Sequence, residues 1–197
     1  VALTSGKGAV AMDTEGKEYI DFTSGIGVNS LGYCDDGWVQ AVSRQAARLQ
    51  HISNLYYSDV QTELAGLLCE LTGYSKVFLC NSGAEANECA IKLARKYSEE
   101  KYGQQRSNIV TLKNSFHGRT ITTLAATGQE VFHQYFFPFT QGFSYAEANN
   151  LDSVKSCVDE HTCALLIELV QGEGGVLPLE KGFVQQLSLF CKERDIL

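Results

Sequence analysis

The chain has 197 residues, of which 44% are hydrophobic and 20% charged, and its formal net charge is −7. This composition is typical of a folded globular chain and excludes disorder as the dominant state. No stretch of about 18 apolar residues occurs, so no membrane span is predicted, and an acidic chain without a basic run is a poor match for nucleic acid.

The expected elements of the N-terminal part are a hairpin followed by two helices. Turn residues separate the two strand-like runs, and apolar side chains then recur at helical spacing. In chain order we expect a hairpin of residues 8–13 and 18–22, a loop over 23–32, a helix from Trp38, a loop over 54–59, and a helix from Val60 to Leu71 that ends at Gly73.

From residue 76 onward, strand and helix patterns alternate. We expect a buried strand over 76–80, a helix over 84–102 with Ala86, Ala90, Leu93, Ala94 and Tyr97 inward, a strand over 109–112, a helix over 118–126, an irregular aromatic segment over 132–143, a helix over 150–158, a strand over 164–168, and a closing helix with Phe183, Leu187 and Phe190 on one face. This order predicts an α/β fold with a mostly parallel sheet covered by helices.

The first part of the chain does not follow this alternation. Residues 1–45 are therefore predicted to belong to a small N-terminal lobe, and residues 46–197 to the first part of a larger domain. The chain begins at Val1 and stops at Leu197, where a helix pattern ends and a strand pattern is about to start. Both ends look cut, so we expect a fragment of a longer protein.

The seven cysteines include no CxxC pair. Neither a disulfide framework nor a metal site is predicted from them. Several lie on apolar faces, where a cysteine behaves as a small hydrophobic residue. Reduced core thiols favour a reducing compartment, which predicts a cytoplasmic protein.

The sharpest local feature is the turn between the strand at 76–80 and the next helix. A helix N-terminus presents unpaired N–H groups and a partial positive charge. Ser82, Gly83 and Ala84 could therefore bind an anion, best a phosphate. The alternative is ordinary capping, because Ser82 with Glu85 three residues later is also a capping box. No Walker or GxGxxG pattern occurs, which disfavours a nucleotide loop.

A second feature, residues 115–120, follows the strand at 109–112. Ligand sites form at the ends of parallel strands in open α/β sheets. Phe116 can stack on a planar ring, and Arg119 can hold a carboxylate through two parallel hydrogen bonds. Taken singly, such a phenylalanine more often belongs to the core, and such an arginine is more often a solvated charge.

A third feature places Glu168 and Glu173 around a glycine-rich segment at another strand end. Loops of this kind are usually plain turns, but two carboxylates near a strand terminus can also take part in a ligand site. The glycine-rich residues 25–32 have the same two interpretations, a backbone turn or a lip of a substrate pocket.

In this order and at these spacings, the motifs resemble the class III pyridoxal-phosphate aminotransferases, and within that family the acetylornithine group most closely. The resemblance runs over essentially the whole chain and implies a fold-type I architecture with part of a small N-terminal lobe. Two departures blur the subfamily: residues 33–36 lack the usual His-Cys-His-Pro, and Leu169 stands where proline is usual. The resemblance rests on residues 21–32, 81–88, 91–96, 116–120 and 171–175.

The resemblance also implies a role for each feature, with pyridoxal 5'-phosphate as the cofactor. It implies that Ser82, Gly83 and Ala84 bind the cofactor, with the N–H groups of Gly83 and Ala84 on its phosphate. It also implies that Phe116 stacks on the pyridine ring and that Glu168 lies beside the cofactor. Arg119 would bind the substrate α-carboxylate, and Glu173 would switch between amino donors. An anion site, a flat apolar face and a guanidinium are what this cofactor and an amino acid need.

Relatives continue beyond the position of Leu197 into a strand whose aspartate pairs with the pyridinium nitrogen, and then to the Schiff-base lysine. None of the ten lysines here lies in that context. No catalytic residue is therefore expected within the chain, and the arginine that pairs with Glu173 in relatives is also expected beyond it.

The implied reaction moves the δ-amino group of N-acetylornithine to 2-oxoglutarate, in arginine biosynthesis, in a cytoplasmic homodimer with a shared active site. One alternative is another class III substrate: ornithine, 4-aminobutyrate or succinylornithine. A second is a non-catalytic fragment or pseudoenzyme that lacks the Schiff-base lysine. A nucleotide-binding α/β protein lacks its glycine fingerprint here.

Overall fold

The computed structural model describes all 197 residues and divides into two compact units, Val1–Val77 and Phe78–Leu197. The predicted boundary after residue 45 falls inside a helix, whereas the division into compact units falls after Val77. The assignment of residues 46–77 to a large domain stays a prediction. No helix of the chain is long and apolar enough to cross a bilayer.

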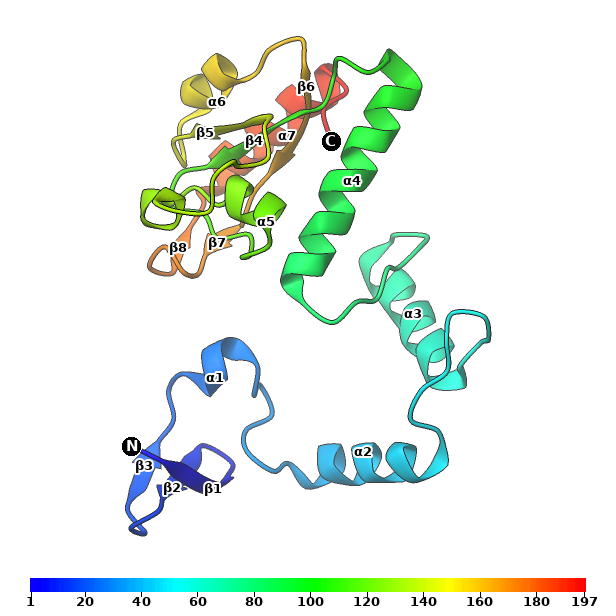
Figure 1. Cartoon of the computed structure of the whole chain (residues 1–197), viewed down its shortest axis with the longest axis vertical. Coiled ribbons are helices and arrows are strands. Elements are labelled where there is room, and N and C mark those ends of the chain that lie inside the picture. The colour runs from blue at the N-terminus through cyan, green and yellow to red at the C-terminus, as the bar shows by residue number, and fades with distance from the viewer. The chain divides into compact units, whose positions relative to one another are not determined.

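The first unit contains a small antiparallel sheet and the two expected longer helices (Figure 1). The hairpin is confirmed, with an additional strand at its side. The elements are β1 (Leu3–Lys7), β2 (Val10–Asp13), β3 (Glu18–Ile20), α1 (Ser24–Gly27), α2 (Asp36–Arg48) and α3 (Asp59–Thr72).

Local chemistry explains where these elements begin and end. The Asp13 carboxylate accepts hydrogen bonds from the N–H groups of Glu15 and Lys17, which closes the turn between β2 and β3. Asp35 caps α2, and Gly73 ends α3 in the left-handed conformation with φ +75°. The predicted loop over 23–32 contains α1, a single irregular turn.

The second unit contains a three-stranded parallel sheet in the order β5-β4-β6. The parallel sheet and its strands at 109–112 and near 164 are confirmed. The elements are α4 (Gly83–Tyr102), β4 (Asn108–Leu112), α5 (Ile121–Ala126), the 3-10 turn η1 (Glu130–His133), β5 (Phe143–Ala146), α6 (Leu151–Cys157), β6 (Thr162–Leu166), the two-stranded β7 (Val170–Gln171) and β8 (Leu177–Pro178), and α7 (Lys181–Glu193).

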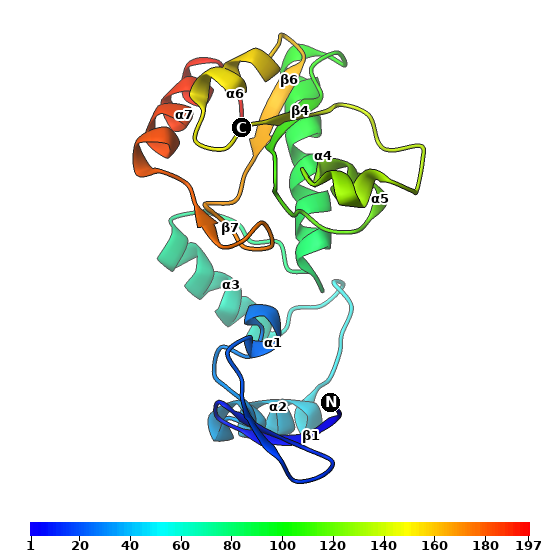
Figure 2. The same ribbon diagram turned by 90° about the vertical axis from the view of Figure 1, so that its left-hand side faces the viewer.

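Both faces of this sheet are covered, as Figure 2 shows for α6 and α7 on one side and α4 and α5 on the other. Side chains alternate between the faces of a strand. Val110 and Leu112 of β4 therefore join a core with α6 and α7, while Ile109 joins a second core with α4 and α5. Phe183, Leu187 and Phe190 are the buried face of α7, as predicted.

Two predictions about the elements from residue 76 onward are wrong. Residues 76–80 form no strand, and Phe78 is 61% exposed. A strand needs a neighbour that takes its backbone hydrogen bonds, and this segment has none in the chain. On α4, Ile91, Ala94 and Ser98 are buried. Of the residues predicted to face inward, only Ala94 does so; the exposed ones are Ala86, Ala90, Leu93 and Tyr97. Because Ser98 is polar, a search for apolar residues at helical spacing does not find the buried face of α4.

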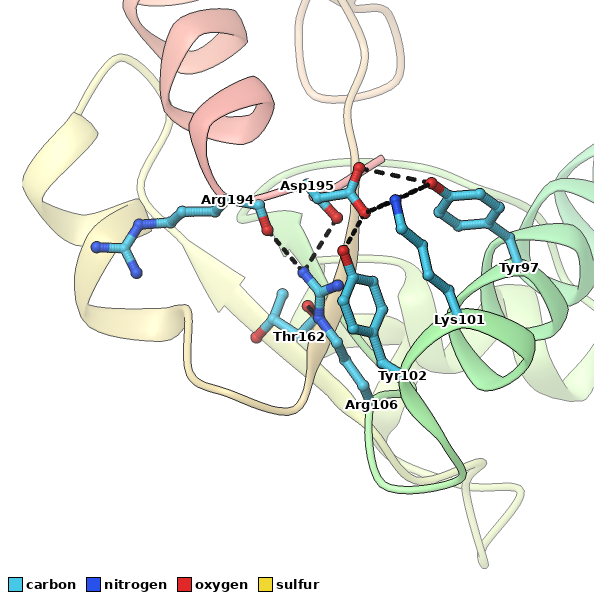
Figure 3. A network of polar contacts seen from close by, with 7 residues as sticks. All are labelled: Tyr97, Lys101, Tyr102, Arg106, Thr162, Arg194 and Asp195. Carbon is cyan, nitrogen blue, oxygen red and sulfur yellow. Dashed lines mark hydrogen bonds and ion pairs between the residues drawn. The ribbon is translucent and has the colours of Figure 1, made fainter.

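The C-terminal end of α4 and the residues that follow it are tied to the segment after α7 by a polar network (Figure 3). Arg106 donates to the carbonyl oxygens of Thr162, Arg194 and Asp195 at 3.0, 2.9 and 3.0 Å. Its guanidinium also stacks on the Tyr102 ring at 4.3 Å. The last residue, Leu197, exchanges backbone hydrogen bonds with β6, so the backbone there runs as a neighbour of that strand.

Candidate functional site

The N-terminus of α4 is open to a ligand. Ser82 is its N-cap: its Oγ accepts from the Glu85 N–H at 3.2 Å, and the Glu85 carboxylate accepts from the Asn81 N–H at 2.8 Å. The capping chemistry left as an alternative by the sequence is therefore present. It leaves the N–H groups of Gly83 and Ala84 without an acceptor in the chain. A Cβ added at Gly83 would meet no atom within 4 Å.

The segment that follows β4 packs against this helix. The Asn87 Nδ2 donates to the His117 carbonyl oxygen at 2.8 Å, and the Glu88 carboxylate accepts from the Thr120 hydroxyl. Gly118 has φ +130°, and a Cβ there would lie 2.8 Å from the Ala84 Cβ. The first and second sequence features therefore meet in space.

Phe116 links the second feature to the third. Its N–H donates to the Glu168 Oε2 at 2.9 Å, and its half-buried ring meets the Phe132 ring edge-on with centroids 5.9 Å apart. The exposed Arg119 guanidinium carbon lies 5.9 Å from the Phe116 ring centroid and 5.5 Å from that of Phe132. The segment after β4 therefore places an aromatic ring, that of Phe116, close to the cation of Arg119.

The glycine-rich loop between β7 and β8 lies beside the end of β4. The buried Gln171 donates to the Lys113 carbonyl oxygen at 2.8 Å, and a Cβ at Gly174 would lie 2.6 Å from the Asn114 carbonyl oxygen. Glu173 is exposed in this loop and has no hydrogen bond or ion pair in the chain. The loop is anchored, while its carboxylate is free.

His117 is 4% exposed, and its Nε2 has no hydrogen-bond partner in the chain. Burial lowers the pKa of this imidazole to about 4. The ring is therefore neutral at pH 7. Its backbone is held from both sides, because the N–H donates to the Thr127 Oγ1 at 3.0 Å and the carbonyl accepts from Asn87.

The structure brings six of the seven predicted residues to the region between the α4 N-terminus and the ends of β4 and β6. Glu173 lies in a loop anchored to the same strand end, and no contact joins it to Arg119. The cofactor and substrate roles stay predictions. Sequence reasoning missed Asn87, Glu88, Thr120, Thr127 and Phe132. The aromatic run near Phe132 was a signal, but nothing local distinguished Asn87 or Glu88 from solvated helix residues.

The whole chain, residues 1–197, matches the family described as Aminotransferase class-III. The chain belongs to this family. Its curated relatives include the acetylornithine aminotransferase of Haemophilus ducreyi, 52% identical over 198 residues, and that of Wolinella succinogenes, 53% identical over 199 residues. Each alignment covers 100% of this chain and 50% of the relative. The chain therefore spans about half the length of the curated relatives it matches.

The fold is also that of solved aminotransferases. The ornithine aminotransferase from Toxoplasma gondii superposes with a TM-score of 0.95 at 32% identity, covering 100% of this chain and 48% of the solved one. The architecture expected from the sequence is confirmed: the α/β fold of the pyridoxal-phosphate-dependent transferases, with a parallel sheet.

The family implies pyridoxal phosphate as the cofactor, and the residues present fit it. The unpaired N–H groups of Gly83 and Ala84 suit a phosphate. The Phe116 ring suits stacking on a pyridine, and the Arg119 fork suits a substrate carboxylate. These three kinds of group are joined through the contacts between α4 and the segment after β4.

Proposed function

We propose that the polypeptide containing this chain transfers the amino group of N-acetylornithine to 2-oxoglutarate, with pyridoxal phosphate as cofactor. The observation that carries this proposal is the meeting of an open helix N-terminus, an aromatic ring and a guanidinium at the end of β4. The choice of donor is supported by the names and the roughly one-half identity of the curated relatives.

When bound, the cofactor withdraws electrons from the substrate's α or ω carbon and so eases proton removal there. The residues of this chain bind and orient. Gly83 and Ala84 hold the phosphate with their N–H groups, and Ser82 keeps those groups in place as the cap. Phe116 fixes the plane of the ring, and Arg119 takes the α-carboxylate of the substrate in a bidentate pair.

Glu168 and Glu173 have different roles in this proposal. Glu168 fixes the backbone of Phe116 through its hydrogen bond and so keeps the ring in place beside the cofactor. Glu173, exposed on an anchored glycine-rich loop, screens an arginine supplied by another part of the protein and thereby sets the preference between ω-amino and α-amino donors. A carboxylate without a partner in the chain is suited to that task.

We assign none of Lys7, Lys101 and Lys113 to covalent chemistry. A nucleophilic lysine needs a lowered pKa. Hydrogen bonds to Asp36, Asp195 and Glu147 instead raise the pKa of Lys7, Lys101 and Lys113. We propose that the Schiff-base lysine lies in the half of the relatives' length that this chain does not cover. We further propose a cytoplasmic homodimer with a shared active site, acting in arginine biosynthesis.

A donor panel tests this function. The complete polypeptide, loaded with pyridoxal phosphate, is assayed for glutamate formation from 2-oxoglutarate with N-acetylornithine, N-succinylornithine, ornithine and 4-aminobutyrate. We expect the highest kcat/KM with N-acetylornithine. A higher value with another donor would change the substrate but keep the class. No turnover with any donor would favour a non-catalytic protein of the same fold.

A further inference from the structure

Two side chains of α4 reach across to the segment that carries Arg119. Asn87 donates to the His117 carbonyl oxygen at 2.8 Å, and Glu88 accepts from the Thr120 hydroxyl. Both side chains are half-buried. Because these contacts lie on either side of Arg119 in the sequence, its backbone is held to the helix at two points.

A third contact lies between them. At Gly118 the backbone comes so close to α4 that a Cβ would be 2.8 Å from the Ala84 Cβ. Ala84 is also one of the residues whose N–H faces the proposed phosphate. The first turns of α4 therefore do two things: their N–H groups form the anion site, and their side chains hold the backbone around Arg119.

The Thr120 hydroxyl also caps the next helix, α5. Thr120 is the N-cap residue of α5, and its Oγ1 accepts a hydrogen bond from the Thr123 N–H at 3.2 Å. The same oxygen donates its proton to Glu88. The start of α5 is thus fixed to α4, and residues 118–119 have little freedom to move between them.

We propose that Asn87 and Glu88 are positioning residues that hold Arg119 at a fixed distance from the phosphate-binding start of α4, and so determine recognition of substrates that carry an α-carboxylate. This inference rests on the proposed function. Phosphate and carboxylate belong to one bound assembly, so their two sites must keep their spacing. A misplacement of about 1 Å can cost on the order of a hundredfold in rate.

The contact between Glu88 and Thr120 acts through a hydrogen bond rather than through the charge of the carboxylate. Glu88 forms no ion pair with any cation of the chain. A glutamine at this position keeps an oxygen that accepts from the Thr120 hydroxyl, whereas an alanine does not. Glu88→Gln should therefore preserve the position of Arg119, and Glu88→Ala should release it.

The experiment compares two donors that differ only in the group that Arg119 recognises, in the complete polypeptide loaded with pyridoxal phosphate. N-acetylornithine carries the α-carboxylate, and N-acetyl-1,4-diaminobutane lacks it. For Glu88→Ala and Asn87→Ala we expect the KM for N-acetylornithine to rise about tenfold, the loss of about one hydrogen bond, with a smaller change in kcat. The single-turnover rate with the amine should stay within about twofold.

Controls separate positioning from general damage. Glu88→Gln should resemble the wild type, and Glu99→Ala, an exposed glutamate of the same helix without a side-chain hydrogen bond, should have no effect. The dissociation constant of pyridoxal phosphate should stay unchanged in all variants, and the melting temperature should fall by no more than the loss of about one hydrogen bond explains. Equal losses with both donors, or weaker cofactor binding in Glu88→Ala, would overturn the proposal and show a structural role.

A second readout does not depend on turnover. Amide hydrogen exchange of residues 117–120 should be faster in Glu88→Ala than in Glu88→Gln or Glu99→Ala, because the released segment opens more often. Unchanged exchange would overturn the proposed restraint even in an active enzyme. Absence of turnover in the wild type, with faster exchange in Glu88→Ala, would instead show that the proposed function is wrong.

Discussion

Arg119 has two aromatic neighbours and no acid partner. Its guanidinium lies near the rings of Phe116 and Phe132, and no carboxylate of the chain pairs with it. Aromatic rings attract the cation through their faces without occupying its hydrogen-bond donors. All five donors therefore stay available for a ligand.

Replacement of Arg119 by lysine tests this residue. Lysine keeps the charge but lacks the planar fork that matches a carboxylate. In the complete enzyme we expect Arg119→Lys to lower kcat/KM for N-acetylornithine by about 10- to 100-fold, with cofactor binding unchanged. Arg44→Lys, an exposed replacement on α2, is the matched control. Equal steady-state kinetics for Arg119→Lys and the wild type would exclude the assigned role.

Glu173 is a second residue whose role is open to a simple test. Truncation of an exposed side chain in a loop has little effect on stability. We expect Glu173→Ala to raise kcat/KM for an α-amino donor such as glutamate relative to N-acetylornithine, because the arginine that Glu173 is proposed to screen would be uncovered. The ratio of the two values is the measurement. A lower melting temperature with the same ratio would show that Glu173 is structural.

His117 makes stability depend on pH. Its folded pKa of about 4 is below the value of 6.5 expected in the unfolded chain. The unfolded state therefore takes up a proton first, and stability is lost as pH falls from 6.5 toward 4, by about 3 kcal/mol in all. Urea denaturation measures the free energy of unfolding at pH 7 and at pH 4.5. The decrease between the two pH values should be smaller in His117→Gln than in the wild type. The exposed His51→Gln should behave as the wild type.

At the scale of elements, α4 is the organising helix of the second unit. Its start offers the open N–H groups, its middle turns bury Ile91 and Ala94 against the sheet, and its end leads into the network around Arg106. One helix therefore runs from the candidate site to the opposite end of the strands, where β6 begins at Thr162. At that end Arg106 donates hydrogen bonds to three carbonyl oxygens.

Arg106→Met tests how much this link contributes. Methionine preserves much of the side chain's apolar volume but leaves three carbonyl oxygens without their donor. We expect the free energy of unfolding to fall by about 2 kcal/mol, since unpaired polar groups at half-buried positions are costly. Urea denaturation measures it. Lys96→Met, which removes an exposed pair with Glu100 on α4, should change it by less than about 0.5 kcal/mol. Similar losses of unfolding free energy in Arg106→Met and Lys96→Met would contradict the stabilising role given to Arg106.

At the scale of the whole molecule, the two units differ in how much apolar surface they bury. Among the buried hydrophobic residues, only Ala11 belongs to the first unit, and the two core clusters lie in the second. Large side chains such as Phe22, 92% exposed, and Tyr57, 98% exposed, leave the first unit with little core. Burial of apolar surface is the dominant source of stability.

This difference predicts how the 197-residue chain responds to protease. Cleavage by a broad-specificity protease at low concentration should occur first within residues 1–77 and leave a fragment close to residues 78–197, because regions with few buried contacts open more often. Mass spectrometry identifies the cut sites. First cuts inside α7 or β4 would contradict the assignment of stability to the second unit. The complete polypeptide is the comparison, in which residues 1–77 should be cut more slowly.

The strongest local signals in the sequence corresponded to real elements. Gly73 ends α3, Ser82 caps α4, and the apolar runs at 109–112 and near 164 are parallel strands. β5 was not predicted, because its four residues follow an irregular aromatic segment and include a polar serine. Residues 76–80 show the opposite error: an apolar run with β-branched and aromatic side chains has no partner strand in this chain.

Motif order and spacing sufficed to indicate the family and the residue types of the site, because anion-binding helix starts, stacking rings and carboxylate-binding arginines have local signatures. Tertiary structure alone decided which of them meet. The Asn87 contact with His117 spans 30 positions, and the Phe116 contact with Glu168 spans 52. Such pairs depend on the register of parallel strands and on the face that α4 turns to the sheet, and no local pattern specifies either one.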